Sequence, residues 1–154
     1  MPAKDSIEIR VLSDPCHLCV VRAAISAAAD RAGLEEPERD KLVLATDEAM
    51  SNVIRHGYGG RTDSPIAVTL SKINENGRAG IQVVIEDESG PVDVSRIRRR
   101  SLDEVRPGGL GVNIIYDSID EVDYAPRPGA VGLRLTLRQF GAANAVSKPK
   151  EGHC

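Results

Sequence analysis

The sequence predicts a two-layer α/β (α+β) sandwich with a mostly antiparallel mixed sheet of about five strands and about three helices on one face. One strand and two amphipathic helices come first, and two hairpins then flank a short third helix. Strand–helix–strand units are too few for a parallel doubly wound sheet. Of the 154 residues, 41% are hydrophobic but only 3% aromatic, so the core must consist mainly of Leu, Ile, Val and Ala.

The N-terminal part predicts a strand and then a helix. Residues 7–11 alternate apolar and polar side chains at period two, which is typical of a strand. Asp14 can cap the following helix, Pro15 suits its first turn, and Gly33 ends it. Between them, apolar residues recur at the spacings of an amphipathic helix: Leu18, Val21, Ile25, Ala28 and Ala32.

A second helix is predicted from Pro37 to about Arg55, with Gly57 near its end. Glu48 and Asn52 belong to this helix and stand on one face, about 40° apart, beside its apolar stripe. The stripe consists of Leu42, Ala45, Ala49 and Val53.

Two hairpins are predicted from alternating apolar residues. The first joins residues 64–73 to residues 79–87 through a turn at Asn76 and Gly77, a pair typical of tight hairpin turns. The second joins residues 119–125 to residues 129–139. Its apolar alternation is Val131, Leu133, Leu135 and Leu137.

Between the hairpins, residues 92–109 have no clean period and are predicted to be mostly loop, followed by a short helix at 110–119. Residues 141–154 are predicted to be a flexible C-terminal tail. We therefore expect one domain, residues 1–140.

Charge and hydropathy exclude several classes. A formal net charge of −3 and a pI of about 5.6 give no overall field that attracts nucleic acid or an anionic membrane. No stretch approaches the ~20 apolar residues of a membrane span, and the N-terminus lacks the apolar core of a signal peptide. We expect a cytoplasmic protein with reduced thiols, since three cysteines do not make a disulfide framework.

Two polar positions are candidates for chemistry. Glu48 and Asn52 could hold a hard cation such as Mg²⁺ with phosphate oxygens, or Glu48 could activate a hydroxyl. Asp87 ends a predicted strand and could accept a hydrogen bond from a ligand amino group. The alternatives are a polar helix flank for the first pair and a turn-forming aspartate for the second.

A glycine-rich stretch precedes the third predicted helix. Backbone N–H groups at Gly108, Gly109 and Gly111, together with the helix dipole, could meet a phosphate. The spacing is not that of a dinucleotide-binding fingerprint, and the Lys-Ser/Thr pair of a P-loop is missing.

These stretches together resemble a known family. "EAMSN", followed by "HGY" at 56–58, is similar to the first motif of the anti-sigma-factor serine/threonine protein kinases (RsbW-like), within the superfamily of gyrase-type and histidine-kinase-type ATPases. "RPGGLGVNIIYDSIDEVDY" resembles their glycine motif and is the most specific stretch. The resemblance spans about residues 7–138. The superfamily usually has glycine two residues after the aspartate, where this chain has Ser89 followed by Gly90.

The resemblance implies a histidine-kinase-type ATPase fold that uses ATP and Mg²⁺. By it, Glu48 is the general base toward the acceptor hydroxyl, Asn52 binds the Mg²⁺ that bridges the ATP phosphates, and Asp87 recognises the adenine amino group. Its further nucleotide-binding positions are Val92, Gly108, Gly109, Leu110 and Gly111.

The implied function is an ATP-dependent kinase that acts as an anti-sigma regulatory factor. It would phosphorylate a Ser or Thr of an anti-sigma-factor antagonist protein in a partner switch, bind a sigma factor, and form a homodimer. The alternative is a non-catalytic ATP-binding, or nucleotide-independent, anti-sigma module. A sensor histidine kinase is excluded because a phosphoacceptor helix, a sensor segment and a membrane span are all missing from the sequence.

Two other motifs leave alternatives open. The arginine run 96–100 is predicted to be a solvated lid or partner-binding loop rather than a nucleic-acid patch, because interleaved aromatic residues are missing. Cys16 and Cys19, with His153 and Cys154, could form a metal site or a low-pKa thiol. Helix-buried or idle cysteines are the expected state.

Overall fold

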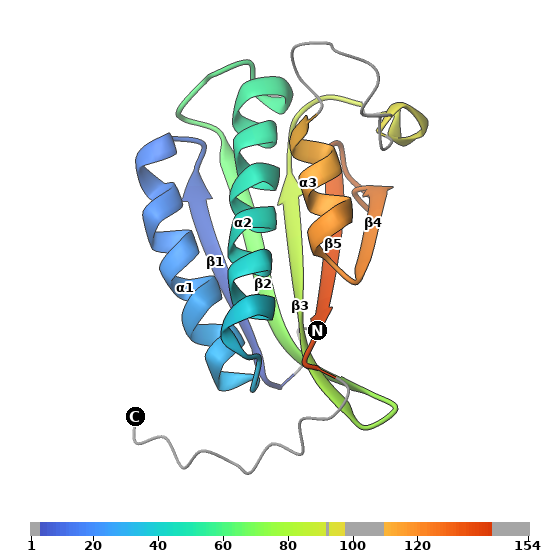
Figure 1. The fold of residues 1–154 in the computed structure, drawn as a ribbon. Coiled ribbons are helices and arrows are strands. Elements are labelled where there is room, and N and C mark those ends of the chain that lie inside the picture. Colours follow the sequence, from blue (N-terminus) through green and yellow to red (C-terminus); the bar gives the residue numbers. More distant parts are fainter. Residues whose placement is uncertain (1–3, 92, 98–109, 143–154) are drawn as a thin grey trace.

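The computed structural model describes residues 4–91, 93–97 and 110–142, apart from the side chains of Arg96 and Leu110. Figure 1 shows three helices side by side on one face of a sheet. In chain order the elements are β1 (Ser6–Leu12), the 3-10 turn η1 (Pro15–His17), α1 (Leu18–Arg31), α2 (Glu36–Asn52), the π-helical turn η2 (Val53–Gly57), β2 (Pro65–Glu75), β3 (Arg78–Asp87), the 3-10 turn η3 (Val94–Arg96), α3 (Leu110–Ser118), β4 (Glu121–Pro126) and β5 (Leu133–Phe140).

The sheet has the strand order β1-β2-β3-β5-β4, and all four pairings are antiparallel. The two-layer α/β sandwich, its five strands and its three helices on one face are confirmed. Among the described strands, the sheet is antiparallel throughout. Both predicted hairpins form, as β2–β3 and β4–β5.

The strand register decides which side chains face the helices. Val68 lies opposite Ile85 and Val83 lies opposite Leu137, so these buried residues share the covered face. Asp87 is two residues beyond Ile85 and therefore points to the same face, because side chains alternate along a strand. A carboxylate thus ends a row of buried apolar residues.

The helix stripes were predicted well. All four members of the α2 stripe are buried, from Leu42 and Ala45 at 0% exposed to Val53 at 8%. On α1, Val21 and Ile25 are buried as expected, and Ala32 just after the helix is buried too. Leu18 and Ala28 are partly buried against the core, and Ala29, which was not predicted, is fully buried. Both helices therefore pack on the sheet through these lines.

The tight turn of the first hairpin was predicted, and one end of the second hairpin was not. Asn76 and Gly77 adopt positive φ values of 52° and 78°, as a two-residue hairpin turn requires. In the second hairpin, Val131 is 57% exposed and lies outside β5, so its assignment to the strand was wrong. The strand begins only after Gly132, whose φ is +124°.

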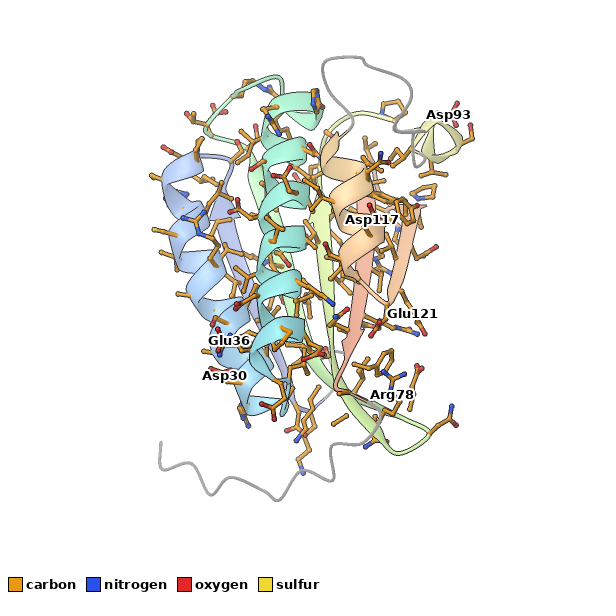
Figure 2. All side chains as sticks on the ribbon, viewed as in Figure 1. Asp30, Glu36, Arg78, Asp93, Asp117 and Glu121 are labelled. Atoms are coloured by element: carbon orange, nitrogen blue, oxygen red, sulfur yellow. The ribbon has the colours of Figure 1, made fainter. Side chains whose placement is uncertain are left out.

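Many charged side chains lie at the periphery. Figure 2 labels Asp30, Glu36, Arg78 and Glu121 around the rim, while other side chains fill the space between helices and sheet. Within the described part of the chain, no helix is long and apolar enough to cross a membrane. Most of the predicted loop at 92–109 and of the tail at 141–154 falls outside the described residues, so the tail stays a prediction.

Candidate functional site

Glu48 and Asn52 lie near the C-terminal end of α2 and face the first turn of α3. Both side chains are half-buried. A methyl group added at Gly111 would place its carbon 2.7 Å from Glu48 Oε2 and 3.4 Å from Asn52 Nδ2. A side chain at Gly111 would displace the Glu48 carboxylate, so the structure joins the predicted acid–amide pair to the helix after the glycine-rich stretch.

The π-helical turn η2 continues α2. Its wider winding is marked by the Tyr58 N–H, which donates to the Val53 carbonyl at 2.9 Å. Such turns occur frequently at functional sites. Here the turn brings Gly57 against Ser89: a carbon added at Gly57 would lie 3.2 Å from Ser89 Oγ and 3.8 Å from Asp87 Oδ2.

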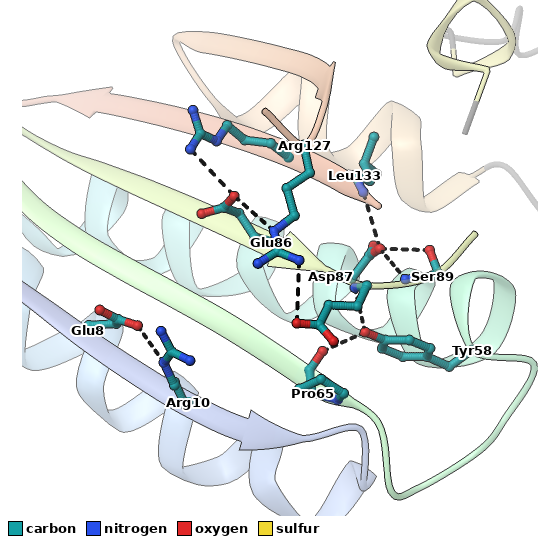
Figure 3. A network of polar contacts seen from close by, with 11 residues as sticks. Glu8, Arg10, Tyr58, Pro65, Glu86, Asp87, Ser89, Arg127 and Leu133 are labelled. Carbon is teal, nitrogen blue, oxygen red and sulfur yellow. Dashed lines mark hydrogen bonds and ion pairs between the residues drawn. The ribbon is translucent and has the colours of Figure 1, made fainter. Parts of the chain in front are cut away.

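Asp87 is the most constrained polar residue of the site (Figure 3). The residue is only 3% exposed, and the Oδ1 atom of its carboxylate accepts three hydrogen bonds. The donors are the Ser89 backbone N–H at 2.9 Å, the Ser89 hydroxyl at 2.7 Å and the Leu133 backbone N–H at 3.2 Å. All hydrogen bonds to this carboxylate from the described residues use Oδ1, which leaves Oδ2 for a ligand.

Gly132 explains how β5 reaches this carboxylate. A side-chain carbon there would lie 2.0 Å from the Asp87 backbone oxygen and 3.1 Å from Oδ1, and its φ of +124° also disfavours other residues. The backbone at Gly132 can therefore pass close enough for the Leu133 N–H to donate. Burying a carboxylate in this way is tolerated because charge-assisted hydrogen bonds replace water.

Tyr58 connects three parts of the site through its hydroxyl. The hydroxyl donates to the Pro65 carbonyl at 2.5 Å and accepts the Glu88 N–H at 2.7 Å, which links the end of η2 to the start of β2 and the end of β3. The residue is 4% exposed. Burial raises the pKa of the Tyr58 phenol, and the carboxylates of Asp87 and Glu88 act in the same direction.

Arg127 lies beside the buried carboxylate on the outer side of the sheet. Its guanidinium is 3.5 Å from Glu86 Oε2 and 3.4 Å from Glu88 Oε1. The backbone N–H of Arg127 donates to the Gly132 carbonyl at 2.9 Å. Figure 3 shows the ion pair of Arg127 with Glu86 among the contacts near the end of β3. They hold the β4–β5 turn close to the residues that follow Asp87.

The predicted site residues fall into three groups. Glu48, Asn52 and Gly111 come together, and Gly57 brings Asp87 to the same end of α2. Leu110 begins α3, but its side chain is not described. Val92, Gly108 and Gly109 lie outside the described residues, so their predicted roles stay predictions.

Sequence reasoning missed the residues that hold Asp87 and the neighbouring strand ends in place. Tyr58 was noticed as part of a motif but was given no role, and Arg127, Gly132 and the Leu133 N–H were not predicted at all. The available signal was Gly132, a glycine between the apolar residues Val131 and Leu133, because a glycine in a predicted strand often marks a close backbone approach.

The donor set at Glu48 and Asn52 suits a hard cation. A carboxylate and an amide oxygen are the ligands that Mg²⁺ accepts, and Mg²⁺ commonly takes only one or two protein ligands beside substrate phosphates. In the described ranges, no group of three or more His, Cys, Asp or Glu side chains forms a metal site. A cation at Asn52 would therefore need phosphate oxygens and water to complete its coordination.

Comparisons with known proteins agree on one family. The model of the family described as "Histidine kinase-like ATPase domain" matches residues 11–138. The chain is 24% identical over 135 residues to the serine-protein kinase RsbW of Bacillus pumilus, which covers 81% of both chains. It is 27% identical over 134 residues to the enzyme of that name from Staphylococcus aureus, covering 82% of both. The resemblance stated from the sequence is confirmed.

A solved structure shows the same fold. The crystal structure of the RsbU and RsbW domains of a Mycobacterium tuberculosis protein superposes with a TM-score of 0.58 at 17% identity. The match covers 94% of this chain and 35% of that chain. At this identity the likeness concerns the fold alone.

We predict that Tyr58→Phe lowers the free energy of unfolding by about 1–3 kcal/mol, because it leaves a buried N–H and a carbonyl without their shared partner. Urea unfolding of the two proteins measures the difference. Tyr116→Phe is the matched control, since the described contact of Tyr116 is with the Tyr124 ring, 6.2 Å between centroids. Equal losses for the two variants would contradict the bridging role of Tyr58.

Proposed function

We propose, because the chain belongs to the histidine kinase-like ATPase domain family, that it binds ATP and transfers the γ-phosphoryl group to a serine or threonine of another protein. The observation that carries this proposal is the meeting of Glu48 and Asn52 with Gly111. Phosphoryl transfer depends mainly on positioning and charge neutralisation. A rigid helix end that faces the start of another helix supplies both.

At the phosphate end, we assign separate roles to the two side chains of α2. Asn52 would hold Mg²⁺, which neutralises phosphate charge when bound. Glu48 would accept the proton of the attacking hydroxyl while the oxygen–phosphorus bond to ADP breaks. Backbone N–H groups in the first turn of α3 would contact phosphate oxygens, as at other helix N-termini.

At the base end, Asp87 would recognise adenine. Since Oδ1 already accepts three hydrogen bonds, Oδ2 is the atom that would accept the exocyclic amino group. Ser89 supports this by fixing the carboxylate through both its N–H and its hydroxyl. The serine that replaces the usual glycine therefore fits nucleotide binding in this chain.

The proposed partners follow from the relatives, which are named serine-protein kinase RsbW. We infer that the chain is an anti-sigma factor of a partner switch. Its phosphate acceptor would be an anti-sigma-factor antagonist protein and its other partner a sigma factor, and it would act as a homodimer in the cytoplasm. Direct nucleic-acid or membrane binding is not part of this proposal.

A non-catalytic module is the second candidate. Such a protein would bind ATP, or no nucleotide, and sequester its partner without phosphorylating anything. Asp87 and its hydrogen bonds do not distinguish a kinase from a non-catalytic module that binds ATP, because both would bind the nucleotide in the same way. The two candidates differ at Glu48, which only a kinase needs.

The first prediction from the proposed function concerns the residues assigned to the phosphates. Asn52→Ala should abolish the heat of Mg²⁺-ATP binding in calorimetric titration. Glu48→Gln should keep ATP affinity near that of the wild type but slow phosphotransfer by about 10²–10⁴-fold, the usual contribution of a general base. Transfer is measured with labelled ATP and an antagonist protein.

Glu36→Gln provides the matched control, because Glu36 lies exposed at the other end of the same helix (Figure 2). It should change neither quantity. Phosphotransfer by Glu48→Gln at the wild-type rate would remove the general-base role and favour another base. A wild-type protein that binds no ATP at millimolar concentration would overturn the nucleotide site altogether.

The second prediction concerns base recognition. In Asp87→Asn, the three donors around Oδ1 require the amide oxygen there, which places the NH₂ group at the position of Oδ2. A donor then faces the adenine amino group, so ATP affinity should fall about 10- to 100-fold. GTP, whose base carries an acceptor oxygen at that place, should be weakened less.

Fluorescence competition with ATP and GTP measures the two affinities. Asp123→Asn, on an exposed residue of β4, is the control for the same change of charge. If Asp87→Asn weakened the affinities for ATP and GTP equally, the adenine assignment would be contradicted. The proposed phosphate-binding residues are tested separately by the calorimetric titration above.

A further inference from the structure

Two cysteines at the start of α1 have no part in the site described above. Cys16 lies in the 3-10 turn η1 and Cys19 in the first turn of α1. Both are free thiols and both are exposed, so of the expected states, helix-buried or idle, burial is wrong. In the described ranges they belong to no group of metal-ligating side chains.

The local backbone places the two thiols on the same side of the turn. Residues three apart on a helix have Cβ atoms about 5–6 Å apart. Cys16 lies in the 3-10 turn and Cys19 is the second residue of α1, so the pair spans the junction of the two elements. A disulfide has about 3.5–4.5 Å between Cβ atoms, so a small tightening at this junction would bring the pair within reach. The Cys19 thiol already points back toward Cys16, because it donates to the Cys16 carbonyl at 3.2 Å.

We propose that Cys16 and Cys19 form a reversible dithiol–disulfide pair that reacts with low-molecular-weight disulfides such as oxidised glutathione. The first thiolate attacks a sulfur of the small disulfide and releases one small thiol, which leaves a mixed disulfide on the protein. The second cysteine then attacks the protein-bound sulfur and releases the other small thiol. Two protein thiols are oxidised, one small disulfide is reduced to two thiols, and both protons leave with them.

The surroundings of Cys16 favour the protonated thiol over the thiolate. Asp14 caps the turn by accepting the Cys16 N–H at 2.9 Å. A hydrogen bond to this carboxylate raises the pKa of the Cys16 thiol, and the nearby Cys19 contributes in the same direction. The alternative of a low-pKa thiol is therefore not met at Cys16. Because the thiolate is the attacking species, the raised pKa slows attack by Cys16 on a small disulfide near neutral pH.

The pair is separate from the candidate nucleotide site. Its turn is anchored to the loop before β2, because the Ser13 N–H donates to the Ser64 carbonyl at 2.8 Å and the Ser64 N–H donates to Ser13 Oγ at 3.1 Å. Disulfide formation would close a four-residue turn that is already ordered. The inference thus stands or falls independently of ATP binding.

The test uses the full chain with Cys154→Ser, so that only the two thiols remain. The protein is equilibrated with oxidised and reduced glutathione at neutral pH, unreacted thiols are alkylated, and the peptide containing residues 16–19 is analysed by mass spectrometry. We expect the loss of two hydrogen atoms, and recovery of two alkylatable thiols after dithiothreitol. Circular dichroism of both forms should be the same.

Single variants distinguish the internal disulfide from ordinary glutathionylation. Cys16→Ser and Cys19→Ser should each keep one glutathione as a mixed disulfide, because the second thiol that would displace it is gone. Two glutathiones on the protein with both cysteines, two thiols still alkylatable at an oxidising ratio, or a disulfide between two chains would each overturn the proposal.

A related prediction concerns Asp14. Asp14→Asn keeps an oxygen that can cap the turn but removes the charge, so the pKa of the Cys16 thiol should fall toward its usual range. More thiolate is then present below that pKa, and alkylation of Cys16 by iodoacetamide at pH 7.5 should become faster. The Cys19→Ser background isolates the rate of Cys16. An unchanged rate would contradict the effect of Asp14.

Discussion

The buried carboxylate of Asp87 is the constraint on which the architecture of the site depends. A charged group that is 3% exposed needs donors in place of water, and it receives three of them on one oxygen. One comes from β5, which has to begin at Leu133 for this purpose, and two come from the turn after β3. The close passage of the backbone at Gly132 follows from the same requirement. The carboxylate thus fixes where two neighbouring strands end and begin.

Helix α2 connects this carboxylate to the phosphate end. Its apolar stripe is buried against the sheet, while Glu48 and Asn52 on the adjoining face meet Gly111. Its π-helical continuation then carries Gly57 to Ser89 and Tyr58 to Glu88. Because one helix packs the core and touches both ends of the site, a shift of α2 would change the distance between the groups proposed to bind the base and those proposed to bind the phosphates. Core packing therefore sets the geometry of the proposed chemistry.

Features with a strong local pattern were predictable from the sequence. The stripes of α1 and α2 and the turn at Asn76 and Gly77 follow from periodicity and from positive φ, and both are local properties. The approach of Gly111 to Glu48 and of Gly132 to Asp87 joins residues 63 and 45 positions apart, as their numbers show. Such contacts depend on strand order and helix packing, which no single stretch encodes. Residue roles could be proposed by resemblance, and they stay proposals, whereas the supporting contacts could not be predicted.

The contact between Gly57 and Ser89 accounts for the serine at a position where the superfamily usually has glycine. A carbon at Gly57 would lie 3.2 Å from Ser89 Oγ, so the space that the serine side chain occupies is left open by a glycine on the facing turn. The hydroxyl added there donates to Asp87 Oδ1 rather than standing in the way of Oδ2. The substitution therefore strengthens the hold on the proposed adenine-binding carboxylate. Ser89 is therefore no argument that nucleotide binding has been lost. The choice between a kinase and a non-catalytic module rests on Glu48.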